Sequence, residues 1–204
     1  MSPHCEKLES GLKVVLVPCE SESVAVGMFV ASGSRHEDNR RAGISHFIEH
    51  MLFKGTEKRS ALEITREIEG RGGSFNAFTS EESTCFYAHM PDDYLEEALD
   101  ILIDMFKNAK IGENEFAMEK SVILEEIKMY GDDPDSVVME NLQKCLFPGH
   151  PLGRSVAGDM NTVSALTRED MKGWIKSHYL PAKTTLVVAG HFDEAKVLER
   201  ARGL

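Results

Sequence analysis

The sequence lacks the features that mark several large classes of protein. It has only four cysteines, at positions 5, 19, 85 and 145, and no two of them have the C-x-x-C spacing of a redox or zinc motif. It has no apolar run of about 18 residues, so we expect no membrane span. Residues 1–7 do not contain the apolar core of a signal peptide. These absences favour free thiols in a reducing compartment, and we expect a cytoplasmic protein, or a protein of the mitochondrial matrix if the source is eukaryotic.

Basic residues are scarce relative to acidic ones. The chain has 23 Lys and Arg against 34 Asp and Glu, for a net charge of −11. Nucleic-acid binding requires basic patches that neutralise phosphates, and the basic residues here are scattered and outnumbered. The negative charge is consistent with simple solubility, and it would also attract basic peptides.

The pattern of elements predicts an α+β fold built from one domain. No repeat, low-complexity tract or linker divides the 204 residues. Apolar, β-branched runs predict strands at 12–18, 24–31, 72–80, 83–90 and 184–189, of which 72–80 and 83–90 form a hairpin. Helical periodicity and capping patterns predict helices at 42–53, 60–70, 91–105, 113–130, 135–146 and 167–180, a further helix from 192, and a long loop at 148–161. Strands and helices do not alternate strictly, which favours a two-layer α/β sandwich with a mainly antiparallel sheet covered by helices.

The stretch His46-Phe47-Ile48-Glu49-His50 carries the candidate chemistry. A helix turns about 100° per residue, so His46, Glu49, His50 and Phe53 share one face, roughly opposite an apolar stripe of Ile44, Ile48, Met51 and Leu52. Two imidazoles four residues apart on a helix can converge on one zinc ion. Glu49 lies between them and can take a proton from a water molecule that the zinc activates. The alternative is a chance occurrence of H-x-x-E-H, which the separation of the histidines from the apolar stripe makes less favoured.

A catalytic zinc ion needs a third protein ligand, and the helix at 113–130 offers candidates. Glu119, Val122, Ile123 and Glu126 fall on one stripe, whereas Glu125 is rotated about 100° away from Glu126. A carboxylate on an otherwise apolar stripe needs a charged partner, and zinc would provide one. The alternative is a salt bridge to a buried lysine or arginine.

These motifs resemble the pitrilysin–insulysin family of zinc metallopeptidases, which carry the inverted H-x-x-E-H motif. The similarity is carried by the stretches 43–56, 73–79, 84–87, 179–181 and 186–190, and it is greatest to the branch that holds mitochondrial processing peptidase β subunits and bacterial processing proteases. The resemblance implies a processing-peptidase-like metallohydrolase fold. It also implies that the distal zinc ligand is Glu126, which lies 76 residues after His50 (from 50 to 126), and that Glu119 supports the site.

The resemblance implies further properties of the site and its partners. We expect one Zn²⁺ per chain, held by His46, His50 and Glu126. Asn76 and Ala77 would belong to an edge strand that pairs with the substrate backbone, and Phe53 would line the pocket beside the scissile bond; ordinary strand and core packing is the alternative for Asn76 and Phe53. Members of the family carry a second, similarly folded half, so residues 1–204 would be the N-terminal, zinc-binding half of a longer or two-chain peptidase.

The sequence therefore predicts a zinc-dependent endopeptidase that acts on peptides or presequences, with Glu49 as the general base. Such peptides could be basic, in view of the net charge and of the acidic pair Glu81-Glu82 beside the proposed edge strand. The chain alone would bind zinc but cleave poorly, and an exposed apolar face would favour a dimer or a partner subunit. The competing function is a non-catalytic structural subunit of the same fold. S-ribosylhomocysteine lyase shares H-x-x-E-H but uses a cysteine ligand, and the later motifs and the positions of Cys85 and Cys145 exclude it.

Overall fold

The computed structural model describes residues 2–204, and its centre is a six-stranded sheet with the order β1-β2-β6-β3-β5-β4. The strands are β1 (His4–Lys7), β2 (Lys13–Pro18), β3 (Ser23–Val30), β4 (Ser74–Thr79), β5 (Thr84–Pro91) and β6 (Thr184–Gly190). Neighbouring strands are antiparallel except β2 and β6, which are parallel. The sheet is thus mainly antiparallel, as predicted, and β4 forms one of its two edges.

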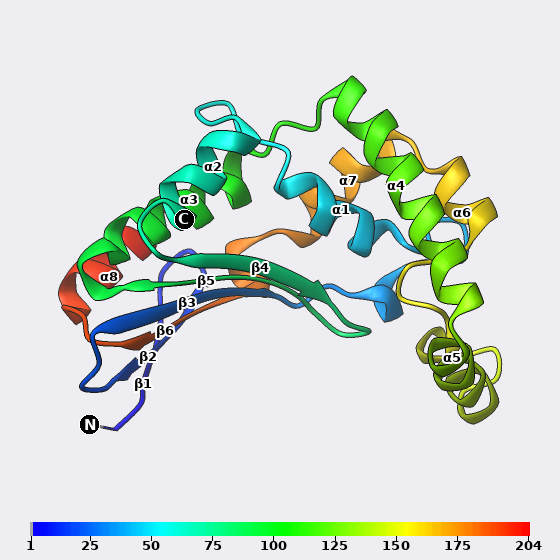
Figure 1. The fold of residues 1–204 in the computed structure, drawn as a ribbon. Helices are drawn as coiled ribbons and strands as arrows, with labels where there is room; N and C mark the ends of the chain where they lie inside the picture. Colours follow the sequence, from blue (N-terminus) through cyan, green and yellow to red (C-terminus); the bar gives the residue numbers. More distant parts are fainter. Residues whose placement is uncertain (1) are drawn as a thin grey trace.

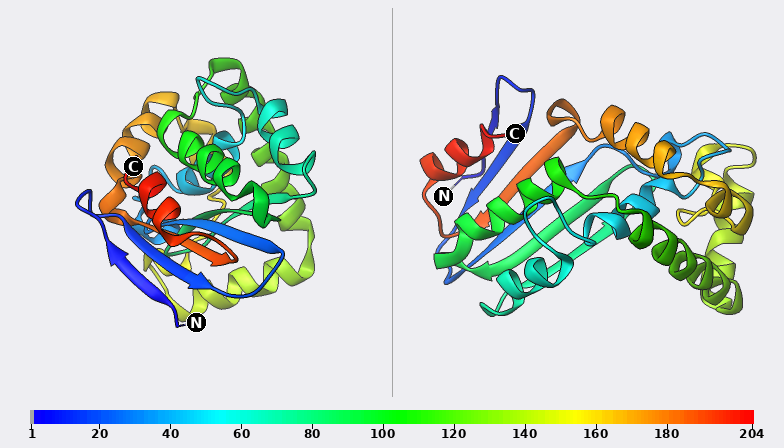
Figure 2. Two further views of the ribbon diagram at one scale, coloured as in Figure 1. Left: turned by 90° about the vertical axis from the view of Figure 1, so that its left-hand side faces the viewer. Right: turned by 90° about the horizontal axis from the view of Figure 1, so that it is seen from above.

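Helices cover one face of this sheet, as Figure 1 shows for α1, α2 and α3. The helices are α1 (Ile44–Leu52), α2 (Ala61–Glu69), α3 (Leu95–Asn108), α4 (Glu113–Asp132), α5 (Pro134–Leu146), α6 (Met160–Ala165), α7 (Arg168–His178) and α8 (Glu194–Ala201). The view from above in Figure 2 shows the strands passing beneath this helical layer. The predicted two-layer α+β architecture is therefore confirmed.

The core lies between the sheet and the helices and follows the alternation of each strand. In β3, Val24, Val26, Met28 and Val30 are buried toward the helices, whereas Phe29 points to the other face and is 38% exposed. Successive side chains of a strand point to opposite faces, so a strand with one covered face buries every second residue.

The opposite face of the sheet carries apolar side chains with no helix over them in the described part of the chain (Figure 1). Phe29, Phe78 and Tyr87, from three neighbouring strands, are exposed there, and the Phe78 ring centroid lies 6.3 Å from each of the other two. Helix α5 extends from the end of α4 and buries none of its side chains. Its exposed residues include Val138, Met139, Leu142 and Leu146.

Two elements differ from the sequence-based expectation. Strand β1 was not predicted, because its sequence, His-Cys-Glu-Lys, is mostly polar and exposed, and only its pairing with β2 makes it a strand. Helix α6 was not predicted: it begins at Met160, at the end of the predicted loop 148–161, and continues to Ala165. Asp159 caps its N-terminus by accepting hydrogen bonds from the backbone amides of Asn161 and Thr162. No helix among residues 2–204 has the length and apolar character needed to cross a membrane.

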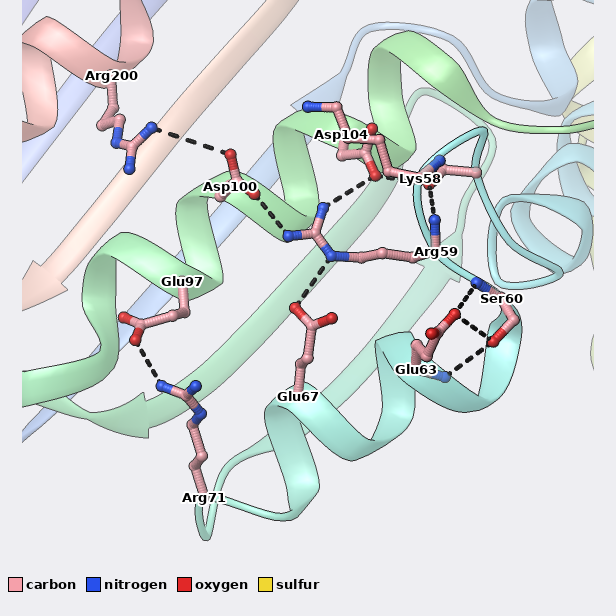
Figure 3. Close-up of polar contacts among 11 residues, drawn as sticks. Lys58, Arg59, Ser60, Glu63, Glu67, Arg71, Glu97, Asp100, Asp104 and Arg200 are labelled. Atoms are coloured by element: carbon pink, nitrogen blue, oxygen red, sulfur yellow. Dashed lines mark hydrogen bonds and ion pairs between the residues drawn. The ribbon is translucent and has the colours of Figure 1, made fainter.

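A cluster of charged side chains fixes the loop that follows α1 (Figure 3). The Arg59 guanidinium donates to Glu67 of α2 at 3.0 Å and to Asp100 and Asp104 of α3 at 2.6 and 3.0 Å. Asp104 is buried and also accepts a hydrogen bond from Thr56 Oγ1 at 2.6 Å. The loop is thereby held to α3, which limits movement at the C-terminal end of α1.

Candidate metal centre and active site

Helix α1 presents two histidines and a glutamate on the side opposite its buried face. Ile44, Ile48, Met51 and Leu52 are at most 2% exposed, whereas His46, Glu49 and His50 lie on the other side, as the sequence predicted. The apolar stripe fixes the rotation of the helix about its axis, and that rotation directs the two imidazoles and the carboxylate toward α4 and β4.

The start of α1 is held by a buried carboxylate from the preceding loop. Gly43, at the N-cap, has φ +94°, a conformation that favours glycine, and offers no side chain as a cap. Glu37 takes that role: its two oxygens accept hydrogen bonds from the backbone amides of Gly43 and Ser45, both at 2.8 Å. Burial raises the pKa of Glu37, and these backbone hydrogen bonds oppose the rise. The negative charge also matches the positive end of the helix dipole.

Three candidate ligand atoms converge between α1 and α4. His46, His50 and Glu126 each offer one atom, and these atoms lie within 4.8 Å of one another. Glu126 Oε2 is 3.9 Å from His46 Nε2 and 3.6 Å from His50 Nε2, and the two Nε2 atoms are 3.2 Å apart. Within residues 2–204 this is the group of histidine, cysteine and acidic side chains with the geometry for a metal ion.

The donor set fits zinc. Glu126 Oε2 is buried and has no hydrogen-bond donor among the described residues, although a buried carboxylate oxygen without a partner is unfavourable. Two imidazoles and one carboxylate are a known ligand set for catalytic zinc, which leaves a fourth position open. Burial, and then the neighbouring His50, lower the pKa of His46 to about 4, so this imidazole is neutral and able to bind a metal at physiological pH.

Glu119 lies behind His50 rather than with the three candidate ligands. Its Oε1 is 2.9 Å from His50 Nδ1, and its Oε2 is 2.6 Å from Lys54 Nζ. Burial alone would lower the pKa of His50, but the hydrogen bond with Glu119 and the charge of Glu126 outweigh it and raise that pKa. A carboxylate at Nδ1 fixes the ring and leaves Nε2 free to bind a metal. Glu119 thus forms a salt bridge, although with a partly exposed lysine rather than the buried one considered as the alternative, whereas Glu126 faces the histidines.

Glu49 is anchored by the edge strand. Thr79 Oγ1 donates a hydrogen bond to Glu49 Oε2 at 2.6 Å. Burial raises the pKa of Glu49, and the bond from Thr79 opposes this effect. A carboxylate with a raised pKa is suited to accept a proton and later release it near neutral pH.

A second hydrogen bond orients Glu126. Tyr130, one helical turn further along α4, donates from its hydroxyl to Glu126 Oε1 at 2.7 Å. This bond, together with burial, raises the pKa of Tyr130 to about 12. With Oε1 engaged, Oε2 is the oxygen that faces the histidines.

The predicted substrate-binding residues fall into two groups. Ala77 points toward the helical layer. Phe53 packs in the same layer, and its ring centroid lies 4.8 Å from that of Phe75. Asn76 lies on the open face of β4, and its Oδ1 accepts a hydrogen bond from the amide of Ala77 at 2.8 Å. Because β4 is an edge strand, its backbone is accessible to an added strand. An added strand would therefore pair with the backbone of β4 rather than with the Asn76 side chain.

Two details of the sequence analysis need correction. Val122 was predicted on the stripe with Glu119, Ile123 and Glu126, but it is 51% exposed; the inward face of α4 is centred on Glu119 and Ile123, and Val122 lies beyond its edge. The acidic pair Glu81-Glu82 was offered as one reason for a preference for basic peptides. In the structure, however, Glu82 pairs with Arg35, and Glu81 accepts a hydrogen bond from Gln143 of α5 at 2.6 Å.

The supporting residues Glu37, Lys54, Thr79 and Tyr130 were not found from the sequence. Lys54 is four residues after His50, so its place near the site could have been inferred from the helical period. Tyr130 is likewise four residues after Glu126. Glu37 and Thr79 act through contacts between separate segments of the chain, for which the sequence has no local signal.

Comparisons with known proteins identify the family of the chain. Residues 13–160 match the family model described as insulinase, peptidase family M16. The chain is 40% identical over 188 residues to an uncharacterized zinc protease, YmxG, of Bacillus subtilis, covering 92% of this chain and 46% of that protein. It is 36% identical to a probable mitochondrial-processing peptidase subunit beta of Arabidopsis thaliana, covering 97% of this chain and 37% of that protein.

The solved structures show the same relation in three dimensions. A crystal structure of a protease from Helicobacter pylori superposes with a TM-score of 0.94 at 27% identity, covering 99% of this chain and 49% of that one. The chain thus spans about half the length, or less, of the curated relatives it matches. The family model and the curated relatives together show that this chain belongs to the insulinase family, peptidase family M16.

Proposed function

We propose that this chain is the zinc-binding catalytic half of a metalloendopeptidase that hydrolyses peptides or presequences. The observation that carries the proposal is the convergence of His46, His50 and Glu126 beside the carboxylate of Glu49. The relatives named as zinc proteases and as a processing peptidase subunit support the same class of activity.

Each residue of the site has a role that follows from its contacts. His46 Nε2, His50 Nε2 and Glu126 Oε2 would hold one zinc ion, with Glu119 and Tyr130 fixing two of these ligands. A zinc ion bound there would lower the pKa of a water molecule toward about 7 and polarise the scissile carbonyl. Glu49 is placed to accept the proton of the attacking water, and the same carboxylate would deliver it to the leaving amine. Its Oε2 is held by Thr79, so Oε1 is the oxygen available for the proton.

An extended peptide would bind along β4. This strand forms an edge of the sheet, and it ends at Thr79, whose side chain contacts Glu49. Main-chain hydrogen bonds to an edge strand hold a peptide with little dependence on its sequence. Ala77 lies on the face of β4 that looks toward α1, and Phe53 follows the last residue of α1 and packs against the same core; both would contact substrate side chains there.

A second half of similar fold would complete the enzyme. The chain spans about half of the relatives it matches, and two of its surfaces are apolar and uncovered: the open face of the sheet and the exposed side of α5. Contiguous exposed apolar surface marks interaction sites. We propose that the second half docks on these surfaces and closes over the peptide, and that the isolated chain self-associates through them.

We also propose a preference for basic peptides, which is now supported by the net charge alone. Glu81 and Glu82 are already paired, so the preference rests on the net charge of −11. Cleavage of matched basic and acidic peptides at low and high salt tests it, because attraction between solvent-exposed charges is screened by salt. Equal rates that do not respond to salt would refute the preference.

The test of the function compares the chain alone with the chain supplied with its second half. We expect the chain alone to bind one zinc ion but to cleave an unfolded peptide slowly, because holding the substrate in reactive geometry can contribute about 7–11 kcal/mol. Glu49→Gln should keep zinc and lose about 10²–10⁴ of the rate. Full activity of the isolated monomer, unchanged by the second half, would refute the division of labour. Loss of zinc from a folded Glu49→Gln variant would refute its role as the base.

The alternative is a non-catalytic structural subunit of the same fold. Such a subunit has no need for two ligating histidines, a third ligand and a carboxylate anchored beside them. Zinc binding without any peptidase activity in the complete assembly would restore this alternative.

A further inference from the structure

Thr79 connects the edge of the sheet to the candidate general base. It is the last residue of β4, and its side chain points to the helical side of the strand, where it reaches Glu49 of α1. Its hydroxyl donates to Glu49 Oε2 at 2.6 Å, a short distance typical of a hydrogen bond to a charged oxygen. Beyond Thr79 the strand ends in the turn that leads to β5, with the pair Thr79 and Thr84 closing the ladder.

This hydrogen bond is the single one made by the Glu49 side chain within residues 2–204. A glutamate side chain has three rotatable bonds, so without an anchor its carboxylate would occupy several positions. With Oε2 held by Thr79, the carboxylate plane has one preferred orientation, and Oε1 is left without a protein donor. The neighbouring imidazoles of His46 and His50 are already turned toward Glu126.

Because Thr79 belongs to β4, its contact with Glu49 also links the general base to the strand that would bind the peptide. A peptide paired with β4 would make main-chain hydrogen bonds to the same strand that carries Thr79. The hydroxyl is therefore fixed relative to the peptide backbone, and through it so is the carboxylate of Glu49. One strand would set both the position of the scissile bond and the position of the group that takes the proton.

We propose that Thr79 is a positioning residue that aligns the Glu49 carboxylate with a peptide bound on β4. The proposal rests on the proposed function and extends it by assigning the alignment of the base to the substrate-binding strand. Thr79 itself exchanges no proton with the substrate, and within residues 2–204 its hydroxyl bonds to Glu49 rather than to His46, His50 or Glu126.

A purely structural role for Thr79 predicts different measurements. If the hydroxyl served only to hold β4 against α1, its loss would distort the edge strand and weaken peptide binding, which raises KM. If it positions the base, its loss lowers kcat while KM stays the same, because the interaction matters in the transition state. Two of the three candidate ligands, His50 and Glu126, are held by Glu119 and Tyr130 rather than by Thr79, so zinc affinity should not change in the second case.

The experiment uses the active assembly of the chain with its second half. Thr79→Val keeps the size and the β-branched shape of the side chain but removes the hydroxyl. Thr79→Ser keeps the hydroxyl and removes only the methyl group. Thr185→Val is the matched control: Thr185 lies in β6, and its hydroxyl makes no hydrogen bond to any described residue. We expect Thr79→Val to lose about tenfold or more in kcat, a part of the 10²–10⁴ that a general base supplies. KM and zinc affinity should stay within about twofold, while Thr79→Ser and Thr185→Val should resemble the wild type.

A double-mutant cycle on unfolding tests the contact without any assay of activity. The free energy of unfolding is compared for the wild type, Thr79→Val, Glu49→Ala and the double variant, and coupled residues give non-additive changes. Additive changes would overturn the role of Thr79 but leave the proposed function intact. A Thr79→Val variant with unchanged kcat in an active assembly would do the same. A raised KM or lost zinc with unchanged kcat would overturn it in favour of the structural role. A wild-type assembly that binds no zinc and cleaves no peptide would overturn the proposed function, and the role of Thr79 with it.

Discussion

Replacing Glu119 by glutamine should weaken zinc binding although Glu119 is not one of the three converging ligands. In the structure its two oxygens accept from His50 Nδ1 at 2.9 Å and from Lys54 Nζ at 2.6 Å, and the carboxylate is buried. A glutamine has one acceptor and one donor group, so either the imidazole N–H or the ammonium would face an amide N–H. Loss of such a carboxylate behind a ligating histidine typically weakens metal binding 10–100-fold. That range corresponds to about 1.4–2.7 kcal/mol.

The dependence on pH gives this prediction a specific signature. Zinc competes with a proton for His50, and Glu119 raises the pKa of His50 against the opposing effect of burial. In the wild type, affinity should therefore fall as the pH drops through this raised pKa. In Glu119→Gln the pKa of His50 is lower, so the decline begins at a lower pH. The variant should be weaker at alkaline pH, and the two curves should converge on acidification.

The assay is a competition titration against a chromophoric zinc chelator over a range of pH. Lys54→Met is the companion variant, because it removes the counter-ion but leaves the bond between Glu119 and His50. It should show a smaller loss than Glu119→Gln. Equal affinity for Glu119→Gln and the wild type, or two curves that stay parallel at every pH, would refute the reasoning.

Three further predictions follow from contacts around the site. Glu37→Ala should lower the free energy of unfolding by about 2–4 kcal/mol, measured by chemical denaturation, because it removes the cap of α1 and leaves two amides unpaired; a loss below about 0.5 kcal/mol would contradict this. Tyr130→Phe should weaken zinc binding by about tenfold in the same competition titration, since Glu126 loses the donor at Oε1. Asp104→Asn should destabilise the chain at neutral pH, because hydrogen bonds outweigh burial and lower the pKa of Asp104 in the folded state. That contribution is present above the ordinary pKa of 3.8 and disappears as the pH falls through the lower folded value, so wild type and variant should converge in acid.

The sequence specified the elements whose patterns are local. The period of α1 predicted which face is buried and which carries His46, Glu49 and His50, because one apolar stripe suffices to orient a helix. The paired strands β4 and β5 were likewise evident as a hairpin. By contrast, β1 has no apolar alternation and exists through pairing alone.

Contacts between distant segments could not be predicted in the same way. Thr79 and Glu49 are brought together by the packing of β4 against α1, and nothing in either segment specifies that packing. Val122 is exposed because a different side of α4 meets α1. The helical period predicts that side only to within about one residue. The sequence thus singled out the side chains that converge here, and Glu119 behind His50, but not the supporting residues Thr79 and Tyr130.

The most direct test of the account compares two neighbouring glutamates of α4. Glu126 faces His46 and His50, whereas Glu125 is exposed and pairs with Lys128 on the surface. The measurement is the zinc content and zinc affinity of Glu126→Gln and Glu125→Gln beside the wild type, with circular dichroism to verify that each variant is folded. We expect one zinc ion per chain in the wild type and in Glu125→Gln, and a strong loss in Glu126→Gln. Full zinc binding by Glu126→Gln, or its loss from Glu125→Gln, would contradict the central claim.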